Sequence, residues 1–282
     1  MRSLTALPDD PTYLDRYVAI RDKKHKTTRA RLIAAHALVE GRYKAHAEAI
    51  GNGSLASLEN NHNALLLGDT LRSCYNVATQ PLKQLKQAIR EAQPKRTLKY
   101  CPMCGTTLPR TFDHYLPGAK FPEFAVHPLN LVPCCSTCNS TKDDFWLSAS
   151  GKRLFWHAYT DKVPDLQFVR VTLHEDQALA GVGATFSLDK PSGVASDLWE
   201  LIDSHFRRLK LIERYDERSN DEVAEILSDC GVFLETGGQD VQAFLNGQAK
   251  DRSTVYGRNH WIAVLMDAMA QHQNLAAWIN AA

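Results

Sequence analysis

Two Cys-x-x-Cys pairs constrain this chain more than any other feature of its sequence. Cys101 and Cys104 form the first pair, Cys135 and Cys138 form the second, and 30 residues separate them. Each pair can present two thiolates about one edge of a tetrahedron apart, so two pairs complete a four-sulfur Zn²⁺ site. The sequence therefore predicts a zinc ion that joins the two ends of an inserted segment.

The remaining cysteines leave one choice open. Cys134 lies next to Cys135, and we prefer Cys135 as the ligand because it is separated from Cys138 by two residues. The total of seven cysteines is odd, and the N-terminal residues turn acidic before an apolar secretory segment forms. We therefore expect a reducing cytoplasm, where clustered cysteines are more often metal ligands than disulfides. No apolar run approaches the roughly 20 residues that span a bilayer.

Outside the cysteine segment, the hydrophobic pattern is mostly helical. Apolar residues recur at helical spacing between Asp10-Pro11 and Val39, over 62–76, and from Pro81 to the residues before Pro94. Further helical patterns cover 196–215, 219–228, 239–246 and 258–279. Alternation predicts two short strands, at 167–173 and 184–188.

These patterns predict an α+β fold that is mostly helical. We expect a helical N-terminal region over 1–97, a small zinc-bound module over 98–146, and a helical C-terminal region with a short β-hairpin over 147–282. The length of 282 residues is ample for a buried core.

The net charge of +1 hides an asymmetry. Residues 1–100 carry 17 basic and 9 acidic side chains, whereas residues 101–282 carry 16 and 23. A basic segment is typical of a surface that faces a polyanion or a second part of the protein, and equally of solvated helix faces. On the predicted helix from Pro81, Lys83, Lys86 and Arg90 share one stripe, which makes them candidate phosphate contacts.

Polar residues between and after the cysteine pairs suit phosphodiester hydrolysis. His114 is the side chain here that can act as a base near neutral pH without a large pKa shift. Asp113 offers a carboxylate oxygen and Asn139 an amide oxygen, a donor set that suits Mg²⁺ or Mn²⁺. Because neighbours on a strand point to opposite faces, Asp113 and His114 must converge through a bend at the strand end, which Leu116-Pro117 favours.

In order and spacing, these residues resemble the HNH endonuclease family. That family has a ββα-metal fold, with an Asp/Glu-His pair at the end of the first strand, an Asn in the inter-strand loop, and an Asn or His on the following helix. Asp113-His114, Asn130 and Asn139 match these positions. The two cysteine pairs match the zinc-stapled subgroup, in which the metal clamps both ends of the motif.

The resemblance implies a role for each matched residue. His114 would be the general base that activates water, and Asp113 and Asn139 would hold the catalytic Mg²⁺ or Mn²⁺. Asn130 would brace the loop and keep His114 oriented. Lys142 lies one helical turn after Asn139 and would contact phosphate or solvent. The zinc would be structural, because a unit this small depends on metal binding for folding energy.

The sequence therefore predicts a cytoplasmic, metal-dependent endonuclease that hydrolyses DNA, nicking one strand unless two copies cooperate. The resemblance also suggests bacterial anti-phage defence together with an ATPase or other regulatory partner. The helical flanks would provide DNA contacts, a homo-oligomer interface or a partner surface.

Two other functions stay open. One is an RNA-cleaving effector that uses the same site, which a requirement for the 2′-hydroxyl would identify. The other is a non-catalytic zinc ribbon that binds nucleic acid or protein. Four histidines lack partners at ligand spacing and are predicted to be structural: His127, His157, His174 and His205. Gly257–Trp261 is predicted to open a helix, with Trp261 in the core.

Overall fold

The computed structural model describes residues 2–176 and 181–281, which form two compact units. The N-terminal unit comprises Ser3–Met103 and Thr107–Asp161. The C-terminal unit comprises Met1–Arg2, Cys104–Thr106 and Lys162–Ala282. Helices dominate the described residues, and two small sheets accompany them. This confirms the prediction of a mostly helical α+β fold.

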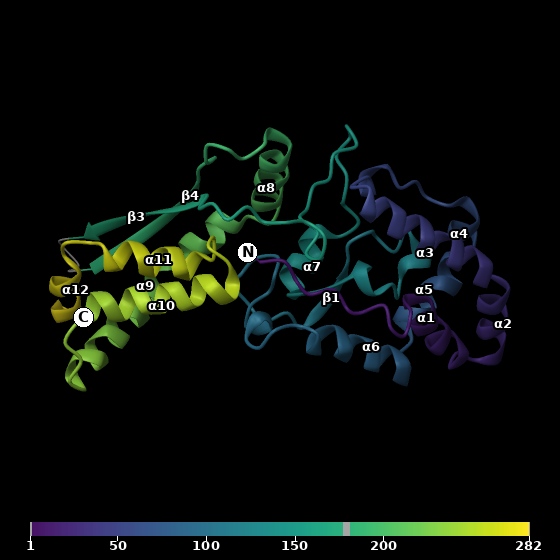
Figure 1. Ribbon diagram of the computed structural model, residues 1–282, viewed down its shortest axis with the longest axis horizontal. Helices are drawn as coiled ribbons and strands as arrows, with labels where there is room; N and C mark the ends of the chain where they lie inside the picture. Colours follow the sequence, from purple (N-terminus) through teal and green to yellow (C-terminus); the bar gives the residue numbers. More distant parts are fainter. Residues whose placement is uncertain (1, 177–180, 282) are drawn as a thin grey trace. The chain divides into compact units, whose positions relative to one another are not determined.

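Six helices begin the N-terminal unit (Figure 1). They are α1 (Tyr13–Asp22), α2 (Lys26–Ala34), α3 (His36–Gly51), α4 (His62–Leu66), α5 (Gly68–Asn76) and α6 (Gln80–Glu91). A capping box between Thr12 and Asp15 starts α1, slightly later than the predicted start at Asp10-Pro11.

Helix α6 follows the predicted pattern closely. The Thr79 hydroxyl accepts a hydrogen bond from the Leu82 amide and caps the N-terminus, and Pro81 occupies the first turn. Leu82, Leu85 and Ile89 are buried, so the cationic stripe of the same helix faces away from this apolar face.

A two-stranded hairpin followed by a short helix completes the N-terminal unit. Strand β1 (Thr111–His114) pairs antiparallel with β2 (Leu131–Cys134), and His114 lies opposite Leu131. Helix α7 (Ser136–Lys142) begins directly after β2 and contacts β1. The hairpin connection contains two 3-10 turns, at Pro122–Phe124 and Pro128–Asn130.

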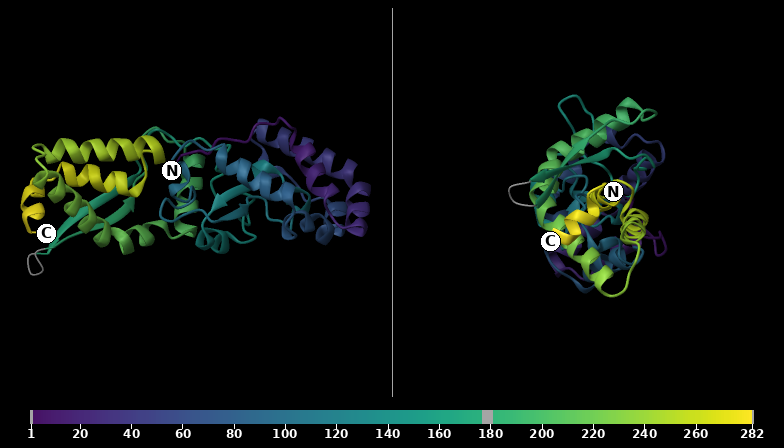
Figure 2. Two further views of the ribbon diagram at one scale, coloured as in Figure 1. Left: turned by 90° about the horizontal axis from the view of Figure 1, so that it is seen from below. Right: turned by 90° about the vertical axis from the view of Figure 1, so that its left-hand side faces the viewer.

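The C-terminal unit packs helices against a second hairpin. Its elements are β3 (Val169–Asp176), β4 (Gly181–Leu188), α8 (Ser196–Arg208), α9 (Leu211–Glu235), α10 (Val241–Tyr256), α11 (Trp261–Ala270) and α12 (Leu275–Ala281). Helix α9 lies along β4, and α10 lies along α11, as the green and yellow helices in Figure 2 show.

The predicted helices of this unit have other boundaries in the structure. The helix predicted over 239–246 is the first half of the longer α10, and the one predicted over 258–279 is divided between α11 and α12. The helix predicted over 196–215 is interrupted because Lys210 adopts a left-handed conformation (φ 51°). The helix predicted over 219–228 forms the middle of the longer α9. Tyr215, Val223 and Ile226 are all buried along α9, so packing extends the helix beyond its local signals.

Histidine contributes unusually to the core of the N-terminal unit. His46, His127 and His157 are almost fully buried, and the rings of His46 and His127 lie 4.4 Å apart in an edge-on contact. His205 is also buried, whereas His174 is exposed and lies 2.7 Å from the hydroxyl of Thr185. Among the described residues, no helix combines the length and apolarity that crossing a bilayer requires.

Candidate functional site

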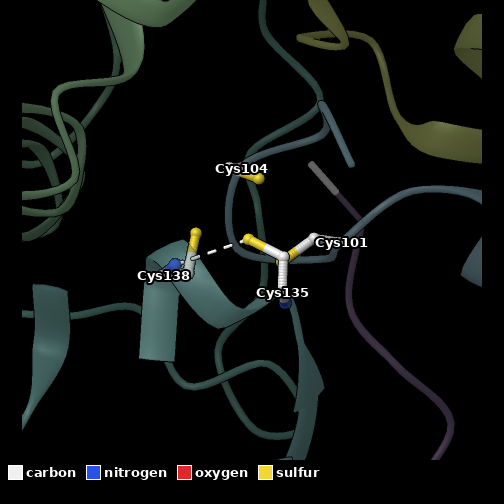
Figure 3. Close-up of side chains that lie close together, drawn as sticks. All are labelled: Cys101, Cys104, Cys135 and Cys138. Carbon is white, nitrogen blue, oxygen red and sulfur yellow. Dashed lines mark hydrogen bonds between the residues drawn. The ribbon is translucent and has the colours of Figure 1, made fainter. Parts of the chain in front are cut away.

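The four predicted cysteines gather into one buried cluster. Their sulfur atoms all lie within 4.8 Å of one another, and each side chain is at least nine-tenths buried (Figure 3). Tetrahedral Zn²⁺ with Zn–S bonds of about 2.3 Å requires sulfur separations of about 3.8 Å. The cluster can therefore hold a metal ion such as zinc after small side-chain adjustments. Its members are Cys101, Cys104, Cys135 and Cys138.

Local backbone features bring these thiols together. Gly105 has a φ of +70°, which an L side chain rarely adopts, and it closes the tight turn after Cys104. The Cys101 sulfur accepts a hydrogen bond from the Cys135 amide at 3.3 Å. The Cys135 sulfur accepts one from the Cys138 amide at 3.4 Å and thereby caps α7. Amide donors aimed at sulfur stabilise thiolates, as a bound cation requires.

The structure also separates Cys134 from this cluster. Cys134 lies on β2, its sulfur is 3.4 Å from the Thr111 hydroxyl, and burial raises its pKa to about 12. The Cys134 sulfur is not among the four that gather in the cluster. The two-residue gap between Cys135 and Cys138 therefore selected the member of the adjacent pair that joins the cluster.

His114 occupies the end of β1 and is held through one ring nitrogen. Its Nε2 lies 2.8 Å from the Ala125 carbonyl oxygen. A carbonyl only accepts, so the neutral ring carries its proton on Nε2 and keeps Nδ1 free of a proton. Burial lowers the pKa of His114 to about 4, so the imidazole is neutral at physiological pH. The expectation that His114 has no large pKa shift was therefore wrong, because the sequence does not reveal this burial.

Asn130 is fully buried within the hairpin connection. Its side-chain oxygen accepts from the Leu116 amide at 2.7 Å, and its amide group donates to the carbonyls of Leu116 and Phe124, both at 3.1 Å. These bonds tie the segment after β1 to the turn that ends at Ala125, whose carbonyl holds His114. Asn130 thus braces the loop that orients the imidazole.

Asp113 lies in a different environment from His114. Its side chain is 5% exposed, and Oδ1 accepts from the Lys142 ammonium at 3.1 Å. Burial raises its pKa and the lysine opposes that change. Lys142 is itself fully buried and also donates to the His114 carbonyl at 2.9 Å. Lys142 is therefore a buried partner of β1, and both the predicted phosphate contact and the predicted solvated lysine were wrong.

An open cleft of about 830 Å³ joins His114 with Asn139 in the N-terminal unit. Asn139 comes from α7, and among the described residues its side chain makes no hydrogen bond. Asp113 is not among the residues that line the cleft in the described part of the chain. The structure therefore brings His114 and Asn139 together, whereas Asp113 pairs with Lys142 outside the cleft. The predicted convergence of Asp113 and His114 was wrong, because both residues lie on the regular strand β1, where neighbours point to opposite faces.

Five cationic side chains from separate elements line this cleft. They are Arg72 of α5, Lys83, Lys86 and Arg90 of α6, and Arg110 before β1. The α6 stripe was visible in the sequence as candidate phosphate contacts. Arg72 and Arg110 carried no local signal, because only the tertiary fold brings them to His114.

One aromatic residue of the cleft also escaped sequence reasoning. The ring of Tyr75 meets the His114 ring edge-on with 4.4 Å between centroids, and its hydroxyl lies 3.4 Å from the Phe112 carbonyl. Tyr75 of α5 therefore packs against the His114 ring, and the Ala125 carbonyl in the hairpin connection holds its Nε2.

Comparison with known proteins found one distant relative. Over 136 residues the chain is 28% identical to "Protein ea31" of Escherichia phage lambda. The matched part covers 48% of this chain and 45% of that protein, so the chain spans less than half of its relative's length. No family model matches the chain, and no solved structure matches it significantly. The functional conclusion is therefore carried by the residues of the site.

Proposed function

We propose that this protein is a metal-dependent endonuclease of the HNH type that hydrolyses phosphodiester bonds in DNA. The observation that carries this proposal is the shared cleft: His114, Asn139 and five cationic side chains face one open space. The order of strand, strand and helix around that cleft supports the same assignment.

His114 is suited to be the general base. Its Nε2 proton is engaged by Ala125, so Nδ1 is the nitrogen that can accept a proton from water. The hydroxide oxygen then bonds to phosphorus while the bond from phosphorus to the 3′ oxygen breaks. The products are a 5′-phosphate and a 3′-hydroxyl, whose proton comes from solvent.

The described residues fit a hard divalent cation only through Asn139. Asn139 offers an amide oxygen in the cleft, whereas Asp113 does not line the cleft and accepts from the buried Lys142 ammonium at 3.1 Å. Asn139 would therefore hold Mg²⁺ or Mn²⁺ together with waters and substrate phosphate, and the position of Asp113 does not fit the expected second protein ligand. When bound, the ion would supply charge stabilisation for the leaving oxygen.

The cysteine cluster would serve the fold. Four sulfur ligands leave zinc no open position for water, so a metal there would be structural. Cys135 and Cys138 flank the first turn of α7, the helix that carries Asn139, so zinc would fix one side of the cleft.

Cleavage of supercoiled plasmid tests the proposal. With Mg²⁺, the wild type should produce nicked circles, and EDTA should stop the reaction. His114→Ala should reduce the rate roughly 10²- to 10⁴-fold, because the general base is lost. Asn139→Ala should be similarly impaired, and His174→Ala, which alters an exposed histidine of β3, should cleave like the wild type.

Other outcomes identify the alternatives. Intact plasmid with cleavage of a matching RNA would favour the RNA-cleaving effector. Nucleic-acid binding without any cleavage, unchanged by His114→Ala, would favour a non-catalytic zinc module. We also propose that a partner such as an ATPase switches the nuclease on in anti-phage defence. Rapid, complete cleavage by the isolated chain at physiological Mg²⁺ would contradict that dependence.

A further inference from the structure

The α6 side of the cleft carries cations with no acidic partner. Among the described residues, Lys83, Lys86, Arg90 and Arg110 form no ion pair, whereas Arg72 pairs with Asp69 at 2.6 Å. Asp144 is the one acidic side chain among the described residues of the lining. Positive charges that lie close together in one cleft repel one another, and an anionic ligand relieves that repulsion.

Two of these cations are held in place by aromatic rings. The Lys86 ammonium lies 3.7 Å from the centroid of the Tyr75 ring, and the Arg90 guanidinium lies 4.9 Å from that of Phe112. Such contacts fix a cation without consuming its hydrogen-bond donors. Burial, followed by repulsion from Arg90, lowers the pKa of Lys86. The side chains of Lys86 and Arg90 are thus held in position and can still donate hydrogen bonds.

The same rings connect the cations to the candidate base. Tyr75 contacts the His114 ring edge-on, and Phe112 lies two residues before His114 on β1. Lys86 therefore shares its aromatic support with His114. A phosphate bound by Lys86 in this cleft would lie close to the imidazole.

The spacing along α6 exceeds the size of one phosphate. Lys83 and Arg90 are seven residues apart, which corresponds to about 10 Å of helix axis. That length is greater than the diameter of one phosphate group, so the row can reach more than one phosphate of a backbone. A row of donors of this length fits successive phosphates of one backbone better than a single small anion.

We propose that α6 grips the nucleic-acid backbone beside the scissile bond, with Lys86 and Arg90 as the inner phosphate contacts and Lys83 as an outer one. This inference rests on the proposed function and adds the element that binds the substrate. The contacts are to phosphate, so they act on any base sequence.

Fluorescence anisotropy with a labelled DNA duplex tests the inference. The titration uses the 282-residue, zinc-loaded chain without added Mg²⁺, and a gel afterwards verifies that the DNA is uncut. Lys86→Gln should weaken binding about tenfold at low salt. It should also reduce the slope of log affinity against log salt by about 1, and Lys86→Gln/Arg90→Gln should reduce it by about 2.

Matched variants keep the test specific. Lys44→Gln removes one positive charge from α3, where the lysine is exposed and pairs with Glu40, so its affinity and salt slope should equal those of the wild type. Lys86→Arg should restore most of the affinity, because the charge and the aromatic contact both return. Thermal unfolding verifies that each variant is folded.

The results separate this inference from the proposed function. If Lys86→Gln and Arg90→Gln weaken DNA binding no more than Lys44→Gln does, the inference is overturned, even if the wild type cleaves DNA. Specific loss of binding in a chain that never cleaves would uphold the role of α6 and overturn the nuclease. Parallel titrations with RNA of the same sequence show which backbone the cleft prefers.

Discussion

Asn130 illustrates how a buried side chain can position an imidazole that it does not touch. Its three hydrogen bonds hold Leu116 on one side and Phe124 on the other. The next residue, Ala125, supplies the carbonyl that fixes the proton of His114. The orientation of the His114 imidazole therefore depends on the side-chain amide of Asn130. This amide stabilises a turn that ends at Phe124, six residues earlier in the chain.

Replacing Asn130 should damage stability and activity together. Asn130→Ala removes three buried hydrogen bonds and leaves backbone groups unsatisfied, so the free energy of unfolding should fall by about 3 kcal/mol. Cleavage by the folded fraction should slow roughly 10- to 100-fold, because the loop no longer holds His114. Urea unfolding and plasmid nicking measure both effects. Asn63→Ala, at an exposed position of α4, is the control, and equal losses in both variants would contradict this role.

At the scale of elements, helix α7 carries residues of both the cysteine cluster and the cleft. It starts at the Cys135 cap and contains Cys138 and Asn139, and it is only seven residues long. A helix this short is marginal without tertiary support. Metal binding at its first turn is therefore the expected source of its stability.

Adjacent cysteines provide a matched test of that dependence. Cys135→Ser should abolish stoichiometric zinc binding and lower the thermal unfolding midpoint, because one of four ligands is lost. Cys134→Ser, one residue earlier and outside the cluster, should retain one zinc per chain. Metal analysis of the purified proteins and thermal unfolding measure the outcome. Full zinc content in Cys135→Ser, or its loss in Cys134→Ser, would refute the assigned ligand set.

At the scale of the whole molecule, buried histidines predict sensitivity to acid. Burial lowers the pKa of His46 to about 4 and that of His127 well below its ordinary value, and neither ring nitrogen of His46 has a hydrogen-bond partner among the described residues. The unfolded chain therefore binds more protons between pH 6.5 and 4. The stability contributed by neutral His46 is complete above pH 6.5 and is lost as the pH falls through this window.

One variant isolates the contribution of the His46 imidazole to this pH dependence of stability. Between pH 7 and pH 5 the wild type should lose roughly 2 kcal/mol of unfolding free energy through His46. His46→Leu should lose correspondingly less, whereas His174→Leu, at an exposed histidine, should behave like the wild type. Urea unfolding at both pH values provides the comparison. Acid release of a cysteine-bound metal affects all three proteins alike, so identical losses in all three would exclude His46 as the cause.

The features predicted correctly from the sequence are those that depend on residues close together in the chain. The gap between Cys135 and Cys138, the start of α6 near Pro81 and the amphipathic stripes depend on neighbours within one or two turns. The long α9 and the break at Lys210 were missed, because packing of buried side chains decides where such helices start and stop.

The sequence by itself determined which four cysteines cluster, the mostly helical fold and the segment in which His114 and Asn139 lie. Only the tertiary structure decided which side chains share the cleft. It brought Arg72 and Tyr75 of α5 and the cations of α6 to His114, and it buried Lys142 against Asp113. The physical reason is that long-range packing selects contacts between residues far apart in the chain, whereas spacing along the chain reports only on near neighbours.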